Sequence, residues 1–138
     1  MPRYEIIPHT ADIGIKAYGK DLKELFQNAA YAMFDIIADL DGLKNSITQP
    51  IEVKAQNSEE LLVAWLNELL YNFYTKQMIF FDFQIEEIGP NSLKAKAFGR
   101  HLGQNRNSLK TEIKAVTYHE LEIEDVKNKC VATVIFDV

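Results

Sequence analysis

The fold is decided by residues 21–39, which read DLKELFQNAAYAMFDIIAD. Apolar side chains recur there at steps of three and four residues, the spacing of one face of an α-helix. They are Leu22, Leu25, Phe26, Ala29, Met33, Phe34 and Ile37. Asp21 can accept hydrogen bonds from the first free amides, and Glu24 stands where a capping box places its acid. We predict a helix over 21–39 that buries this face.

A second helix is predicted to begin after Asn57 or Ser58 and to end near Lys76. Both starting residues are types that cap helix N-termini. Its apolar stripe consists of Leu62, Trp65, Leu66, Leu69, Leu70 and Phe73. We therefore expect both helices to pack one face against a neighbouring layer.

The other periodic segments alternate apolar and polar residues with period two, which is typical of half-buried β-strands. These strands are expected around residues 4–7, 13–17, 51–55, 79–85, 93–97 and 121–123. Residues 131–136 are apolar on both parities, which indicates a central strand covered on both faces. The predicted fold is α+β, with two helices packed on one face of a mostly antiparallel sheet of about seven strands.

Length and composition predict a single domain spanning residues 1–138. Apolar residues make up 47% and charged residues 25%, so disordered and low-complexity classes are excluded. Cys130 is the only cysteine, which excludes an internal disulfide and an iron–sulfur cluster. Because no signal core or membrane-spanning apolar segment is found, we expect a cytoplasmic protein.

The net charge of −5 argues against general binding of nucleic acid through diffuse positive charge. Charge is nevertheless unevenly distributed, since residues 94–114 carry six basic side chains against the single acid Glu112. This segment is either a contact surface for phosphate or an acidic partner, or a solvated loop that offsets the acidic remainder.

Polar residues precede the first long strand in the sequence Pro8-His9-Thr10-Ala11-Asp12. Loops beside rigid strands are common positions for functional groups, which makes His9 and Asp12 candidates. The alternative is structural, since both side chains can instead hydrogen-bond within their own loop.

The last strand ends in Asp137 and Val138, so a side-chain carboxylate stands next to the terminal one. Two adjacent anions repel each other, and a cation between them removes that penalty. If the fold also brings Asp12 there, three oxygen donors converge and suit a hard ion such as Ca²⁺, whose about 6 to 8 ligands would include water or partner groups. The alternative is a frayed, solvated terminus.

The segment 112–120, EIKAVTYHE, concentrates polar side chains at the entry to a strand. Lys114 can reach outward to a phosphate or to a carboxylate such as Asp12. His119 shares the parity of Leu121 and Ile123, which favours a half-buried histidine packed under the strand over a role in proton transfer.

Several catalytic motifs are missing from the sequence: GxxxxGK[ST], HExxH, GxSxG and an EF-hand loop. A self-contained nucleotide hydrolase or protease is therefore unsupported. A small enzyme with His9 or His119 as general base beside Asp12 stays an alternative, as does an RNA-binding adaptor that uses residues 94–114.

Taken in order, these motifs resemble the archease family. The matching segments are His9-Thr10-Ala11-Asp12-Ile13-Gly14, residues 21–34, Leu61-Leu62, Trp65-Leu66-Asn67-Glu68-Leu69-Leu70, Lys114-Ala115-Val116-Thr117-Tyr118-His119 and Ile135-Phe136-Asp137-Val138. The resemblance implies a strand-helix-strand-strand module with an inserted second unit of similar kind. It also implies a non-enzymatic activator of the RtcB-type tRNA-splicing RNA ligase, one that promotes ligase guanylation and multiple turnover and widens the ligase's use of nucleoside triphosphates.

The same resemblance implies a divalent metal site, usually assigned to calcium, on Asp12, Asp137 and Val138. We expect Lys114 to contact a phosphate or an acidic group of the ligase, with His9 and His119 in supporting roles. A chaperone or RNA-binding adaptor is the alternative function, and direct contact with RNA stays open.

Overall fold

The computed structural model describes residues 2–8 and 11–138, except for the side chains of residues 104 and 105. The chain begins with β1 (Tyr4–Ile7), β2 (Ile13–Gly19) and α1 (Leu22–Ile37). It continues through β3 (Ile47–Lys54), α2 (Ser58–Lys76), β4 (Met78–Ile88) and β5 (Ser92–His101). It ends with the 3-10 helix η1 (Gly103–Ser108), β6 (Ala115–Val116), β7 (Glu122–Val126) and β8 (Lys129–Asp137).

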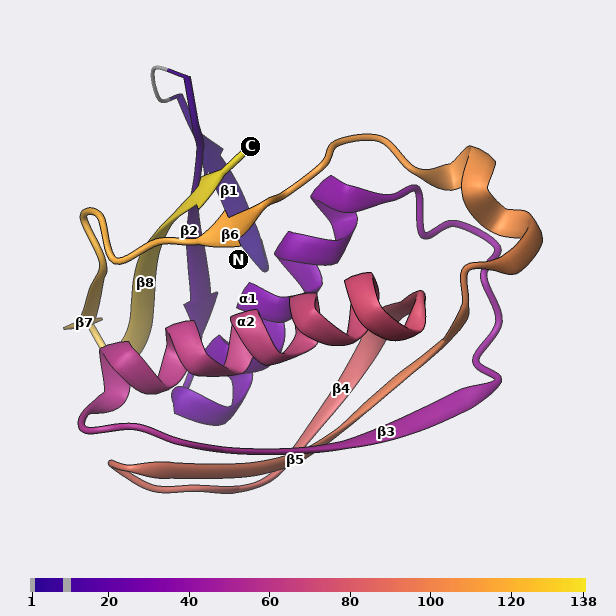
Figure 1. The fold of residues 1–138 in the computed structure, drawn as a ribbon. Helices are drawn as coiled ribbons and strands as arrows, with labels where there is room; N and C mark the ends of the chain where they lie inside the picture. Colours follow the sequence, from indigo (N-terminus) through magenta and orange to yellow (C-terminus); the bar gives the residue numbers. More distant parts are fainter. Residues whose placement is uncertain (1, 9–10) are drawn as a thin grey trace.

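The strands form two antiparallel sheets that enclose the helices (Figure 1). The five-stranded sheet has the order β1-β2-β8-β6, and β7 also pairs with β8. The three-stranded sheet has the order β3-β5-β4. The α+β class is therefore confirmed, although the strands form two sheets where the sequence predicts one sheet of about seven strands.

The helix α1 explains the second sheet, because it is buried on more than the predicted stripe. Ala30, Ala32 and Ile36 lie off that stripe and are also buried. The helix contacts β2 of one sheet and β4 of the other. A helix that is apolar on both sides needs a layer on each of them, which one sheet cannot supply.

Local capping sets where both helices begin, as predicted. Asp21 Oδ1 accepts a hydrogen bond from the Glu24 amide, and Asn57 Oδ1 accepts one from the Glu60 amide, each at 2.9 Å. The Glu24 carboxylate accepts from the Lys20 amide, one residue before the position that a capping box uses. Within residues 2–8 and 11–138, no helix is long and apolar enough to cross a membrane.

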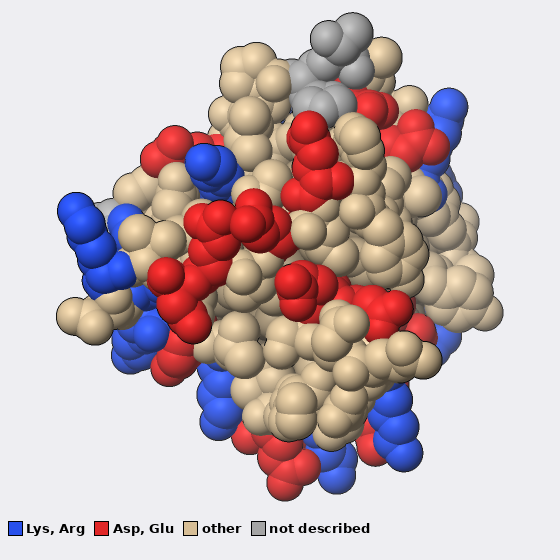
Figure 2. Space-filling model, turned by 90° about the vertical axis from the view of Figure 1, so that its left-hand side faces the viewer, with Lys and Arg blue, Asp and Glu red and all other residues tan. Residues whose placement is uncertain are grey.

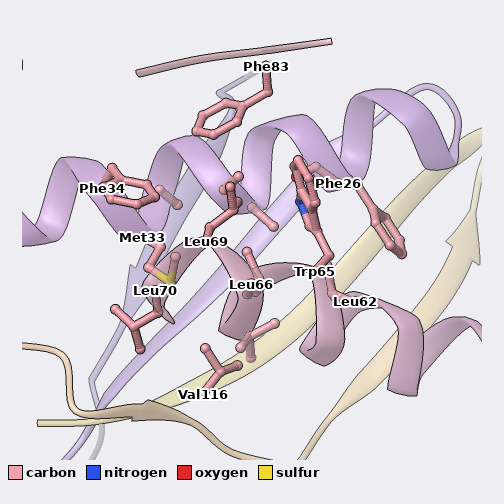
Figure 3. Close-up of a cluster of buried hydrophobic side chains, with 14 of the residues drawn as sticks. Phe26, Met33, Phe34, Leu62, Trp65, Leu66, Leu69, Leu70, Phe83 and Val116 are labelled. Carbon is pink, nitrogen blue, oxygen red and sulfur yellow. The ribbon is translucent and has the colours of Figure 1, made fainter. Parts of the chain in front are cut away.

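The segment from β3 to β5 is inserted between α1 and β6, and we call it the inserted unit; the remaining elements form the first unit. One hydrophobic core joins the two units. Trp65 of α2 donates from its indole Nε1 to the carbonyl oxygen of Phe26 in α1 at 2.9 Å, and its ring meets that of Phe83 edge-on (Figure 3). The inserted unit therefore braces the helix on which the five-stranded sheet rests.

Candidate functional site

The pairing of β2 with β8 brings Asp12 and Asp137 toward each other. The register ends with Ile13 opposite Phe136, so Asp12 directly precedes the last paired residue of β2 and Asp137 directly follows its partner in β8. Asp12 is half-buried and Asp137 is exposed. Both aspartates thus lie at one end of the five-stranded sheet.

Lys114 and Val138 lie at the same end of the sheet, on the β6 side of β8. Ala115 is paired with Asp137, and the Lys114 amide donates to the Asp137 carbonyl oxygen at 2.7 Å. Val138 is half-buried and its side chain packs against the core. The apolar side chain of Val138 therefore anchors the residue that follows Asp137.

The aspartate pair lies on the outward face of the five-stranded sheet, and this face is acidic. Figure 2 shows this side of the molecule, where acidic side chains gather across the middle and Lys and Arg lie mostly at the edges. Glu124 forms a hydrogen bond with Glu122 of β7 and also repels its negative charge. Both interactions raise the pKa of Glu122. Like charges thus lie close together on the β7 part of this face.

The residues at this site fit a hard divalent ion by their chemistry and their placement. The donors are carboxylate oxygens, which Ca²⁺ prefers, and the β2–β8 register brings the two aspartates to the same sheet end. Among residues 2–8 and 11–138, no group of three or more His, Cys, Asp or Glu is arranged to hold a metal ion. The predicted set of donors is of another kind, because its third donor is the carboxylate of Val138 and not a His, Cys, Asp or Glu side chain. Ion binding by this set stays a prediction.

Of the two candidate histidines, His9 lies outside the described residues. His119 is exposed, so the prediction of a half-buried histidine is wrong. The reason is a turn, in which the Leu121 amide donates to the Tyr118 carbonyl oxygen at 3.3 Å and Glu120 has φ of 53°. Because this turn separates His119 from β7, the alternation of the strand does not extend back to it.

The basic segment 94–114 is divided between two parts of the molecule. Lys94 and Lys96 lie on β5, where Lys94 is opposite Glu52 of β3 and Lys96 forms an ion pair with Glu86 at 3.9 Å. The second half, from η1 to β6, runs past the C-terminal ends of both helices. Acidic neighbours thus offset Lys94 and Lys96, and Arg100 is the third basic residue on β5. The positive charge of the second half lies on Arg106, Lys110 and Lys114.

Sequence reasoning missed two residues that position this end of the sheet. Asn67 of α2 accepts a hydrogen bond from the Val116 amide through Oδ1 at 3.2 Å, which fixes the short strand β6. Thr117 donates from its hydroxyl to the Ile135 carbonyl oxygen at 2.9 Å. The available signal was a polar residue on an otherwise apolar face of α2, since Asn67 stands between Leu66 and Leu69.

Comparison with known sequences identifies a family. The sequence model described as "Archease protein family (MTH1598/TM1083)" matches residues 4–138. A protein archease of Methanosarcina acetivorans is 41% identical over 140 residues, which cover 99% of this chain and 96% of that protein. A protein archease of Sulfurisphaera tokodaii is 34% identical over 139 residues and is covered completely, as is this chain.

Two solved structures share the fold. The solution structure of Methanobacterium thermoautotrophicum protein 1598 matches with a TM-score of 0.83 and 32% identity, covering 100% of both chains. The crystal structure of an archease from Thermotoga maritima, described there as a "possible chaperone", matches with a TM-score of 0.69 and 25% identity. That match covers 96% of this chain and 94% of the other.

Proposed function

Because the chain belongs to the archease family, we propose that it is a non-enzymatic activator of the RtcB-type tRNA-splicing RNA ligase in the cytoplasm. In this role it promotes repeated guanylation of the ligase and widens the range of nucleoside triphosphates that the ligase accepts. The observation that supports the proposal is the β2–β8 register, in which Ile13 is opposite Phe136, so that Asp12 and Asp137 follow at the same end of the sheet.

In the proposed mechanism, Asp12, Asp137 and the Val138 carboxylate hold one divalent cation, with calcium as the expected ion. Such an ion supplies positive charge that balances a triphosphate and its leaving pyrophosphate. The three protein donors leave part of the ion's coordination shell to a partner, since Ca²⁺ takes about 6 to 8 ligands. Lys114, held beside Asp137 through its amide, offers an ammonium group to a phosphate or to a ligase carboxylate.

Activation requires more than tight binding. A helper that binds all ligase conformations equally shifts no equilibrium, so this protein must bind the nucleotide-ready conformation more tightly. An ion site that is completed only when the ligase is ready supplies that preference. Release after guanylation then allows one helper to act on many ligase molecules.

The test is a guanylation and ligation time course with limiting ligase and excess nucleotide. We expect Asp137→Asn to abolish the stimulation of multiple turnover, because one carboxylate of the pair becomes neutral. Titration calorimetry with Ca²⁺ and Mn²⁺ should show ion affinity reduced by about tenfold or more. Asp125→Asn is the matched control, since Asp125 is an exposed acid of β7 that is not part of the pair.

Full stimulation by the Asp137→Asn protein would refute the ion-site mechanism. The mechanism would also be refuted if removal of Val138 left the stimulation of ligase turnover unchanged.

A chaperone role is the second candidate, supported by the description of the Thermotoga maritima relative and by the exposed Ile6, Tyr71 and Tyr118. A chaperone would raise the yield of active ligase during refolding, with no effect on turnover of ligase that is already native.

A further inference from the structure

The C-terminal ends of α1 and α2 lie near the chain between β5 and β6 (Figure 1). A groove opens among these segments. Its volume is about 420 Å³, which lies within the range of ligand-binding pockets, about 300–1,000 Å³. Ile37, Phe73 and Leu102 line it, and both Ile37 and Leu102 are almost fully buried. The floor of the groove is therefore apolar.

Hydrogen bonds between distant parts of the chain hold its walls in place. The Leu102 amide donates to the Gln77 carbonyl oxygen, and the Lys110 amide donates to the Ile37 carbonyl oxygen, each at 2.7 Å. Tyr74 donates its hydroxyl to the Ile113 carbonyl oxygen at 2.6 Å. A ligand that enters this groove finds it already formed, so little entropy is lost in ordering it.

The groove is open to solvent, as its mouth residues show. Tyr74 is 48% exposed and Leu109 is 39% exposed, and Tyr71, one turn earlier on α2, is 59% exposed. Small-molecule sites enclose most of their ligand, whereas protein interfaces present open pockets that receive one anchoring side chain. Exposed tyrosines beside an apolar floor fit the second kind of site.

The rim of the groove is mainly basic. Arg106 and Lys110 line it together with one acid, Glu112, and Arg106 donates to the Gln77 side chain at 2.6 Å. The outward face of the five-stranded sheet carries the opposite charge (Figure 2). An acidic segment of a partner is therefore attracted to the groove and repelled by that face.

We propose that this groove docks the RNA ligase by taking an apolar or aromatic side chain from an acidic segment of that protein. The identity of the partner rests on the proposed function. The groove lies near the candidate site, because Glu112 at its edge lies two residues before Lys114, within about 7 Å along the chain. One partner can thus occupy both places at once.

The test separates affinity from activation. Purified ligase is titrated with the wild-type chain, with the double variant Leu109→Glu/Lys110→Glu, and with Arg106→Glu. Both groove variants should raise the Kd for ligase by about tenfold or more, while stimulation at saturating concentration stays at the wild-type level. Lys54→Glu is the matched control for Arg106→Glu, because it makes the same charge change at an exposed position of β3. Thermal unfolding of each variant verifies that it is folded.

Asp137→Asn should show the opposite pattern, with near-normal affinity and lost stimulation. If the folded groove variants bind ligase as tightly as the Lys54→Glu control, the groove is not the docking site, and the proposed function stands. If the wild-type chain neither binds nor stimulates the ligase, the proposed function fails and the assigned occupant of the groove fails with it.

Discussion

The outward faces of the two sheets differ in how their charged side chains are paired. On the three-stranded sheet, the cations of β5 meet acids of the neighbouring strands, with Lys94 opposite Glu52 and Lys96 within 3.9 Å of Glu86. On the five-stranded sheet, Lys16 of β2 is opposite Glu5 of β1, but Glu122 and Glu124 of β7 interact as like charges. Like charges at opposite positions destabilise a sheet, whereas opposite charges stabilise it weakly.

This difference separates the supporting part of the molecule from the part that is expected to bind. The inserted unit balances its surface charge and braces α1 through Trp65. The first unit keeps an unbalanced acidic face that ends at the candidate site. Like charges that lower the stability of a fold at one place indicate a function there, and ion binding is the function proposed here.

The largest effect is expected from Gly99→Ala in the inserted unit. A Cβ on Gly99 would collide with the Ile79 carbonyl oxygen and lie 2.8 Å from the Cα of Phe80. Because the contact is with backbone, we expect a loss of about 3 kcal/mol in the free energy of unfolding. Differential scanning calorimetry should show Tm lower by about 10 °C.

Gly89→Ala is the control, since a Cβ there meets nothing within 4 Å. If the inserted unit only supports the fold, ligase stimulation per folded molecule stays at the wild-type level in the Gly99→Ala protein. A loss of stimulation at a temperature where that variant is folded would contradict the division of roles between the two sheets.

Local signals explain most of what the sequence predicts correctly. The start of each helix follows from a capping side chain that accepts a hydrogen bond from the amide three residues later. The central position of β8 follows from apolar residues on both parities. The adjacency of Asp12 and Asp137 was expected from charge and from the family resemblance. The β2–β8 register brings both residues to one end of the sheet, and a shared ion site there stays a prediction.

What sequence reasoning missed depends on contacts between distant segments. The second sheet follows from how α1 is covered, and the two-residue strand β6 is fixed by the side chain of Asn67. The exposure of His119 depends on a turn at Glu120, a residue type that gives no warning of a positive φ. Residues from three separate segments line the groove, so no single stretch of sequence predicts it.

A moderate effect is expected from Trp65→Phe, at the joint between the units. The change removes the indole that donates to the Phe26 carbonyl oxygen, leaves that buried oxygen without its donor, and opens a small cavity. We expect a loss of about 2 to 3 kcal/mol in the free energy of unfolding. Circular dichroism during chemical denaturation measures it, with Tyr71→Phe as the control because Tyr71 is 59% exposed. A change below about 0.5 kcal/mol would show that this joint contributes little.

The smallest effects compare the two outward faces directly, through Glu124→Gln and Glu86→Gln. Glu124 raises the pKa of Glu122 above its ordinary value of 4.5, so between these two values the folded state holds more protons than the unfolded state. Stability therefore falls as pH rises through that window, and the full penalty applies at neutral pH. Glu124→Gln should raise Tm slightly at pH 7, with the gain vanishing below about pH 4 and shrinking at high salt.

Glu86→Gln should lower Tm slightly or leave it unchanged, because it removes a partner of Lys96. Equal shifts in the same direction would show that the two faces do not differ in how they balance charge.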